Sequence, residues 1–260
     1  MKNTLSIKVS TPPIFDRKLS LARNSVPKDV NYVMYNLLDS HDTERIASLI
    51  VNPGIQKSGD ARDFGNQVLN GFTGGFNTRK PTEKEYDILK LITIFQMTYI
   101  GAPGFYYGDE VGMWGPARSF KPMVWDDLQY ENERYIPDSS VKGPGNRLAK
   151  DDKVEINQDL FRHFQKLIKI RNNNPALRLG DFRTVLTDDH RELIVFSRTY
   201  QNETVIVAIN NGETAQTVKI ETTAAYRDLL NEDKPIQAKD GQISVDVPAK
   251  WGAILKKGSL

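Results

Sequence analysis

The sequence lacks cysteine, and this absence excludes disulfide frameworks, thiolate zinc sites and cysteine nucleophiles. Histidine is scarce, with three in 260 residues (His41, His163 and His190), which limits any histidine-based metal site. No run approaches the ~20 apolar residues of a membrane helix, and the first residues show no apolar signal-peptide core, so the localisation stays open. The 35 basic and 33 acidic residues give a net charge of +2, which predicts neither a nucleic-acid nor a membrane partner.

Residues 30–38 form a nearly continuous apolar run that is rich in valine, tyrosine and leucine. Such a run favours a strand buried on both faces, as in a parallel sheet, with a buried helix segment as the alternative. The run ends abruptly in a polar cluster at residues 39–43, with the sequence DSHDT. This ending is typical of the working end of a strand in an α/β fold.

Helical patterns appear twice further along the chain. Residues 83–99 carry apolar side chains at helical spacing, and the Gly-Ala-Pro at 101–103 predicts the end of that helix. A short strand at 104–107 would complete the order strand, helix, strand, which favours a parallel βαβ unit. Residues 111–157 form a long polar stretch, and loops of this length are often functional. Asn157 is the expected cap of a second helix that ends near residue 174.

From about residue 177 the pattern changes to short β-rich runs without a helical period. The runs are residues 193–196, 205–209, 218–220, 243–247 and 253–255. Between the second and third runs lies Asn211-Gly212, a pair typical of a tight hairpin. We therefore expect residues 177–260 to form a separate antiparallel β domain, and a β-sandwich fits this pattern best.

The best site candidate from the pattern alone is His41-Asp42, at the end of the expected strand. The carboxylate could act as a base, a nucleophile or an electrostatic stabiliser. The alternative is structural, because an acidic residue at this place can also cap the following helix.

Three segments resemble one family of enzymes. Residues 36–45 (NLLDSHDTER) resemble the fourth conserved region of the α-amylase family of glycoside hydrolases, in the form found in the neopullulanase and cyclomaltodextrinase branch. Residues 101–113 (GAPGFYYGDEVGM) and 121–126 (KPMVWD) resemble the same family downstream of that region, in the correct order. The resemblance implies that residues 1–176 are the last strands and helices of a (β/α)8 TIM barrel, including the long loop 111–157. Residues 177–260 would then be the β-sandwich that follows such barrels.

The resemblance also implies roles for individual residues. Asp42 would be the third catalytic carboxylate, which binds the sugar hydroxyls beside the anomeric carbon and stabilises the oxocarbenium-like transition state. His41 would donate a hydrogen bond to the same sugar or, as the alternative, would only orient Asp42. Arg118 is the candidate for gripping a neighbouring sugar, because Phe120 stands where the family carries an arginine. Trp114 is a candidate for stacking on a sugar ring, with loop packing as the alternative.

Two carboxylates that the family needs are missing from this sequence. A retaining glycoside hydrolase uses a nucleophile and a general acid, and both motifs precede the His-Asp motif in the family. Only about 30 residues precede that motif here, whereas a complete barrel takes ~250 residues. We therefore expect a fragment of a retaining, starch-degrading enzyme that is inactive alone. Its expected partners are an α-glucan and either the missing part of the barrel or a second copy of the chain. No cofactor is identifiable, because any calcium site of the family would lie upstream.

Two other classes of function stay open at this stage. The β domain could serve as a non-catalytic carbohydrate-binding or structural module, although only Tyr200, Tyr226 and Trp251 stand out as aromatic side chains there. The His41-Asp42 pair could belong to a metal-dependent phosphohydrolase, but such a site needs further histidines and acids on helices. Whether the enzyme cleaves α-1,4 or α-1,6 bonds cannot be read from these residues.

Overall fold

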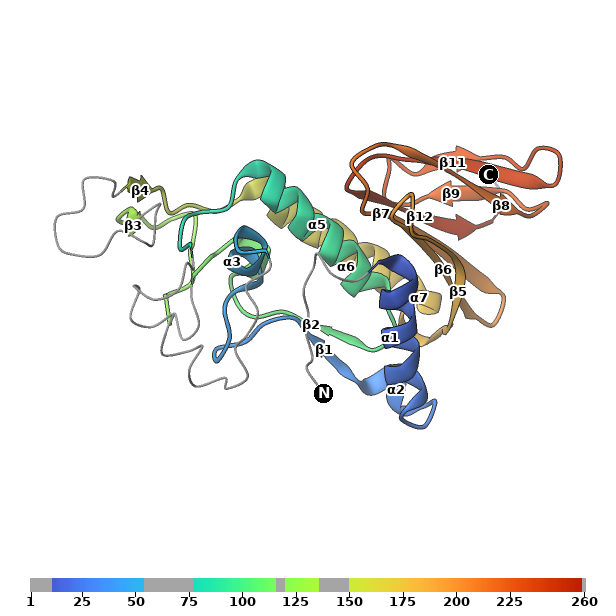
Figure 1. Cartoon of the computed structure of the whole chain (residues 1–260), viewed down its shortest axis with the longest axis horizontal. Helices are drawn as coiled ribbons and strands as arrows, with labels where there is room; N and C mark the ends of the chain where they lie inside the picture. Colours follow the sequence, from blue (N-terminus) through green and yellow to red (C-terminus); the bar gives the residue numbers. More distant parts are fainter. Residues whose placement is uncertain (1–10, 54–76, 116–119, 136–149, 259–260) are drawn as a thin grey trace. The chain divides into compact units, whose positions relative to one another are not determined.

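The structure is a computed structural model that describes residues 11–53, 77–115, 120–135 and 150–258. The chain divides into two compact units (Figure 1). Among the described residues, unit 1 takes in 37–53, 77–89, 104–115, 120–135 and 150–162, and unit 2 takes in 11–36, 90–103 and 163–258. Within the described ranges, no helix is both long and apolar enough to cross a membrane.

Unit 1 holds short elements and long connections. Its own elements are α3 (Ile46–Val51), the 3-10 helix η1 (Asp109–Val111) and the antiparallel pair β3 (Glu133–Tyr135) and β4 (Lys150–Asp152). Two long helices, α5 (Glu83–Thr98) and α6 (Gln158–Asn173), contribute residues to both units. The short strands β1 (Tyr35–Leu37) and β2 (Ala102–Gly104) form a two-stranded sheet.

Unit 2 is dominated by antiparallel β structure. A six-stranded sheet runs in the order β10-β9-β12-β7-β6-β5, and a two-stranded sheet pairs β11 with β8. Three helices, α1 (Pro12–Asn24), α2 (Val30–Val33) and α7 (Pro175–Leu179), belong to the same unit. The strands are β5 (Asp181–Asp188), β6 (Leu193–Tyr200), β7 (Glu203–Asn210), β8 (Gln216–Glu221), β9 (Tyr226–Asp228), β10 (Lys234–Ile236), β11 (Gln242–Val247) and β12 (Trp251–Lys257).

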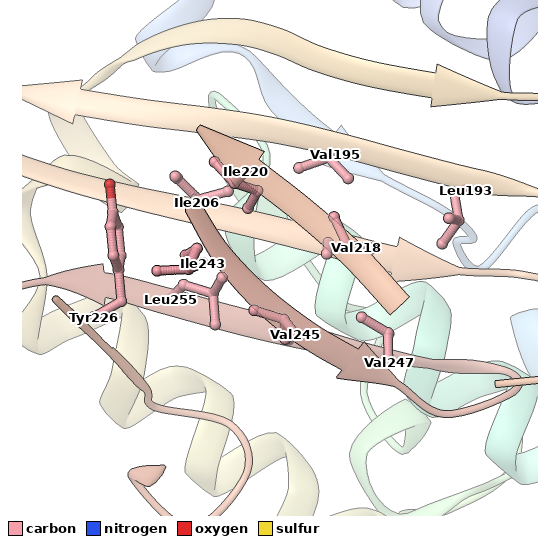
Figure 2. Close-up of a cluster of buried hydrophobic side chains, with 12 residues drawn as sticks. Leu193, Val195, Ile206, Val218, Ile220, Tyr226, Ile243, Val245, Val247 and Leu255 are labelled. Atoms are coloured by element: carbon pink, nitrogen blue, oxygen red, sulfur yellow. The ribbon is translucent and has the colours of Figure 1, made fainter. Parts of the chain in front are cut away.

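One apolar core joins the two sheets of unit 2 (Figure 2). Strands β8 and β11 alternate buried and exposed residues, because successive side chains point to opposite faces of a strand. Their inward side chains meet those of the larger sheet: Val218, Ile220, Ile243, Val245 and Val247 pack with Leu193, Val195, Ile206, Ala208, Ala253 and Leu255. The expectation of an antiparallel β domain is confirmed by this arrangement.

Two buried arginines in unit 2 bind backbone carbonyls around the C-terminal ends of α5 and α7. Arg171 donates to the carbonyl oxygens of Met97, Tyr99 and Gly101 at 2.7, 3.3 and 2.5 Å. Arg198 donates to the carbonyls of Thr98, Leu177 and Gly180 at 2.7, 2.9 and 2.8 Å. These carbonyls carry the negative end of the helix dipole, which favours a cation there. Burial lowers the pKa of each guanidinium to about 10, so both stay charged at neutral pH.

Several sequence predictions hold in the structure. Helix α5 ends just before Gly101, whose φ of 103° belongs to the left-handed region that glycine tolerates. Helix α6 follows Asn157, and the Asn157 side-chain oxygen accepts a hydrogen bond from the Leu160 amide at 3.0 Å. Each of the five β-rich runs lies within a strand of unit 2.

Other predictions are wrong. Residues 30–38 are not one buried strand: they form the single turn α2 and the three-residue β1, and Val33 and Tyr35 are 75% and 64% exposed. Asn211-Gly212 does not make a hairpin, because β7 and β8 belong to different sheets. The second short strand is Ala102–Gly104 rather than 104–107, and the polar stretch 111–157 contains β3 and β4. The predicted domain boundary at residue 176 stays a prediction.

Candidate functional site

The predicted His41-Asp42 pair lies on a tight turn in unit 1. Inside the turn, the Ser40 amide donates to the Thr43 hydroxyl at 2.8 Å and the Thr43 amide donates to the Ser40 carbonyl at 3.2 Å. The side chains of His41 and Asp42 are each 64% exposed, and His41 Nε2 lies 3.2 Å from Asp42 Oδ2. The turn therefore presents an imidazole and a carboxylate together to the solvent.

The base of this turn is closed by a buried carboxyl group. Asp39 Oδ2 accepts a hydrogen bond from the amide of Ile46, the first residue of α3, at 2.7 Å. This bond joins the two ends of the 40–45 segment, so the segment projects from a fixed base. Asp39 itself is almost completely buried.

Arg45 ties the base of the turn to a second loop. Its Nη1 atom donates to the Tyr107 carbonyl at 2.6 Å and lies 3.6 Å from Asp109 Oδ1. The guanidinium also lies 4.7 and 4.8 Å from the ring centres of Tyr106 and Tyr107, which is within cation–π range. The Arg45 amide donates to the Gly115 carbonyl at 3.2 Å.

The second loop is shaped by its own acidic residues. Asp109 Oδ2 accepts from the Tyr106 amide at 3.1 Å, and Glu110 Oε2 accepts from the Gly108 amide at 2.8 Å. Gly108 has a φ of 93°, and a Cβ there would lie 2.3 Å from the sulfur of Met113. A larger residue at this position would thus be strained by both its backbone and its surroundings.

Burial dominates the electrostatics of Asp39 and Asp109. Burial raises the pKa of Asp39, although the hydrogen bond from Ile46 and the charge of Arg45 oppose the change. The pKa of Asp109 is raised well above its usual range by burial and, next, by the charge of Asp39. The two carboxyl groups and Arg45 therefore form one coupled cluster beneath the exposed turn.

The other predicted sugar-binding residues are placed less favourably. Trp114 is buried, and the ammonium groups of Lys80 and Lys121 lie 5.6 and 5.4 Å from its ring. It lines a cavity of about 150 Å³ together with apolar neighbours, Lys121, Tyr130 and the three glutamates Glu131, Glu133 and Glu155. Burial lowers the pKa of Lys121, although Glu133 binds its ammonium group. Arg118 lies outside the described residues.

Neither the metal nor the carbohydrate-module alternative gains support. In the part of the chain that the structure describes, no three metal-binding side chains come together. His163 donates from Nε2 to the Lys90 carbonyl at 3.1 Å. In the β domain, Tyr226 is buried and the Trp251 indole N–H donates to Asn231 at 2.9 Å.

The sequence predicted the turn that carries His41 and Asp42, but it did not predict the buried cluster of Asp39, Arg45 and Asp109 at the base of that turn. Asp39 was part of the polar run at 39–43, and Asp109 belonged to a separate motif 70 positions away. The buried ion pair between Arg45 and Asp109 has no spacing that a single sequence would reveal. The available signal was that both motifs of the resemblance carry an acidic residue at the end of an apolar run, directly after Leu38 in the first motif and after Gly108 in the second.

Comparisons with known proteins show the class of enzyme to which the relatives of this chain belong. Residues 180–255 match the family model of the alpha-amylase C-terminal domain, which covers β5 to β11 and most of β12. The relatives of the chain are glycoside hydrolases of the α-amylase family, so the resemblance stated from the motifs is confirmed.

Three known proteins are similar to this chain over almost its whole length. The chain is 28% identical over 250 residues to "Neopullulanase 2" of Thermoactinomyces vulgaris, covering 94% of this chain and 33% of that protein. It is 31% identical over 255 residues to "Amylopullulanase" of Thermoanaerobacter thermohydrosulfuricus, covering 92% and 14%. A solved "Cyclomaltodextrinase" has the same fold over 97% of this chain and 34% of its own, with a TM-score of 0.65 and 21% identity. The chain thus spans a third or less of these two curated relatives.

Proposed function

We propose that this chain is the part of a retaining α-glucan hydrolase that supplies the transition-state-stabilising carboxylate, Asp42, and a sugar-binding imidazole, His41. The observation that carries the proposal is the exposed His41-Asp42 pair, at the position that the family motif assigns. The turn that bears this pair is closed at its base by the hydrogen bond from the Ile46 amide to Asp39. The names of the curated relatives support an α-glucan as the substrate class.

The geometry suits this chemistry. As the glycosidic bond breaks, positive charge develops on the sugar ring, and the hydroxyl beside the anomeric carbon becomes a stronger hydrogen-bond donor. A carboxylate that accepts this bond binds the transition state more tightly than the ground state, and this difference accelerates the reaction. Asp42 is exposed enough to accept such a bond, and His41, 3.2 Å away, can donate to a neighbouring hydroxyl.

The nucleophile and the general acid would come from another part of a (β/α)8 barrel. In this proposal residues 1–176 are the last part of that barrel and residues 177–260 are the β-sandwich after it. The exposed side chains of Val33 and Tyr35 support this view, because apolar surface next to a two-stranded sheet is typical of an interface that is not yet covered. Trp114 and Arg118 are the candidates for binding neighbouring sugars.

The direct experiment compares the chain with an extended protein, defined as this chain plus the polypeptide encoded immediately upstream of Met1. Release of reducing sugar from soluble starch, pullulan and cyclomaltodextrins measures the activity of both. We expect hydrolysis by the extended protein and none by the chain alone. Turnover by the chain alone, or none by the extended protein, would contradict the proposal.

A further inference from the structure

In the cluster of Asp39, Arg45 and Asp109 beneath the turn, one carboxyl oxygen of each aspartate has no hydrogen-bond donor among the described residues. In each carboxyl group the Oδ2 atom accepts a backbone N–H, from Ile46 for Asp39 and from Tyr106 for Asp109. The Oδ1 atoms of both groups are buried, and no N–H or O–H of the described residues donates to either. A buried acceptor without a donor is costly, so two of them together call for an explanation.

We propose that Asp39 and Asp109 share one proton and act, together with Arg45, as positioning residues that fix the turn carrying His41 and Asp42. This inference rests on the function proposed above for that turn. The shared proton supplies the donor that both Oδ1 atoms lack.

Charge balance supports one proton rather than none or two. Two ionised carboxylates beside one guanidinium would leave a net negative charge in a buried site, which burial strongly disfavours. With one proton, Arg45 faces a single carboxylate, and its Nη1 lies 3.6 Å from Asp109 Oδ1. The phenol of Tyr106 is a further titratable group that interacts with the charges of Arg45 and Asp39.

The two side chains also interact directly. After burial, the charge of Asp39 is the largest cause of the raised pKa of Asp109. The proton belongs to the pair as a whole rather than to either carboxyl group. A shared proton would connect Asp39, which accepts from the Ile46 amide, to Asp109, which accepts from the Tyr106 amide.

Asparagine substitutions make this arrangement testable. In Asp109→Asn, the side-chain NH₂ can donate to Asp39 while its oxygen still accepts from Tyr106, so the variant imitates the protonated acid. Asp39→Asn can do the same with the direction of donation reversed. In the double variant, every orientation of the two amides leaves one donor facing another donor, and Arg45 loses its carboxylate partner.

Two readouts on the full chain test the proposal. The infrared carbonyl stretch reports a protonated carboxyl group, and hydrogen exchange reports the Ile46 and Tyr106 amides that donate to the pair. We expect the wild type at neutral pH to show a protonated carboxyl signal that Asp109→Asn removes. Exchange at the two amides should stay near the wild-type rate in Asp109→Asn and accelerate about 10- to 100-fold in the double variant, as expected for a buried donor that loses its partner.

The pH dependence gives a further readout. Because the pKa of Asp109 is raised in the folded state, deprotonation at rising pH places two charges in the buried pair. Exchange at Ile46 and Tyr106 should therefore accelerate in the wild type relative to Asp109→Asn as the pH rises. A missing protonated-carboxyl signal, equal pH profiles, or a double variant as protected as Asp109→Asn would overturn the proposal.

Asp42→Asn separates this inference from the function on which it rests. That variant should leave the infrared signal and both exchange rates unchanged, since Asp42 lies outside the pair. In the extended protein the Asp39/Asp109 double asparagine variant should lose hydrolysis, whereas Asp109→Asn should keep it. If the extended wild type does not hydrolyse α-glucans, the proposed function fails while the infrared and exchange results still decide whether the proton is shared.

Discussion

The two units bury charge in different ways. In unit 2, Arg171 and Arg198 direct their hydrogen bonds to backbone carbonyls, and neither has a buried nitrogen without a partner among the described residues. In unit 1, Asp39, Arg45 and Asp109 share fewer bonds, and four of their buried atoms lack a partner within the same set of residues.

The difference separates a structural use of buried charge from a functional one. Carbonyls at a helix end do not titrate, so the arginines of unit 2 stabilise one arrangement at any pH where they stay charged. Carboxyl groups do titrate, and an incompletely satisfied cluster next to an exposed candidate site is typical of positions that serve function at some cost in stability. The substitutions below, from the largest expected effect to the smallest, test this contrast.

Arg198→Met should have the largest effect on stability. The fully buried guanidinium leaves behind the carbonyls of Thr98, Leu177 and Gly180, and we expect a loss of about 4 kcal/mol in the free energy of unfolding. Urea denaturation measures this loss, which should not vary between pH 5 and pH 8. Arg183→Met, at an exposed position of β5, is the matched control and should change stability by less than about 0.5 kcal/mol.

Arg45→Met should cost about 3 kcal/mol at neutral pH and less in acid. Without the guanidinium, the pKa of Asp39 in the folded protein rises further above its unfolded value. The variant therefore loses stability as the pH rises, by at most about 1.4 kcal/mol per pH unit. Urea denaturation from pH 4 to pH 8, with the exposed Arg162→Met as control, would reveal this slope. A penalty independent of pH would remove the contrast between the two units.

Asp233→Asn should have the smallest effect. Asp233 pairs with Arg227 at the surface, where their side chains are 49% and 45% exposed, and such pairs contribute below about 0.5 kcal/mol. Asparagine also tolerates the left-handed backbone of this residue, with a φ of 54°. Thermal denaturation at low and high salt should give nearly equal midpoints for the variant and the wild type. A large loss would mean that exposed charge matters as much here as buried charge.

Long periodic segments could be predicted from the sequence, and short apolar ones could not. Helices α5 and α6 and the strands of the β core have a period or alternation that reflects one buried face. The run at 30–38 has no such alternation, and hydrophobicity alone does not tell whether anything covers it. The hairpin predicted from Asn211-Gly212 was wrong because this pair describes only a local turn, whereas β7 pairs with β6 and β12 and not with the next strand, β8.

Only part of the candidate site could be predicted from the sequence. The exposed residues His41 and Asp42 stand side by side in a motif, so a single sequence reveals them. Their support depends on Asp109, which only the folded chain brings near Arg45. Contacts of this kind are set by tertiary structure and leave no local pattern.

The most direct test of the whole account is the turnover number of the extended protein with Asp42→Asn, compared with Asp127→Asn at another exposed aspartate of unit 1. We expect Asp42→Asn to lower kcat on α-glucans by about 10³-fold, as for a lost transition-state interaction, and Asp127→Asn to leave kcat unchanged. Equal turnover by the two variants would contradict the role proposed for Asp42.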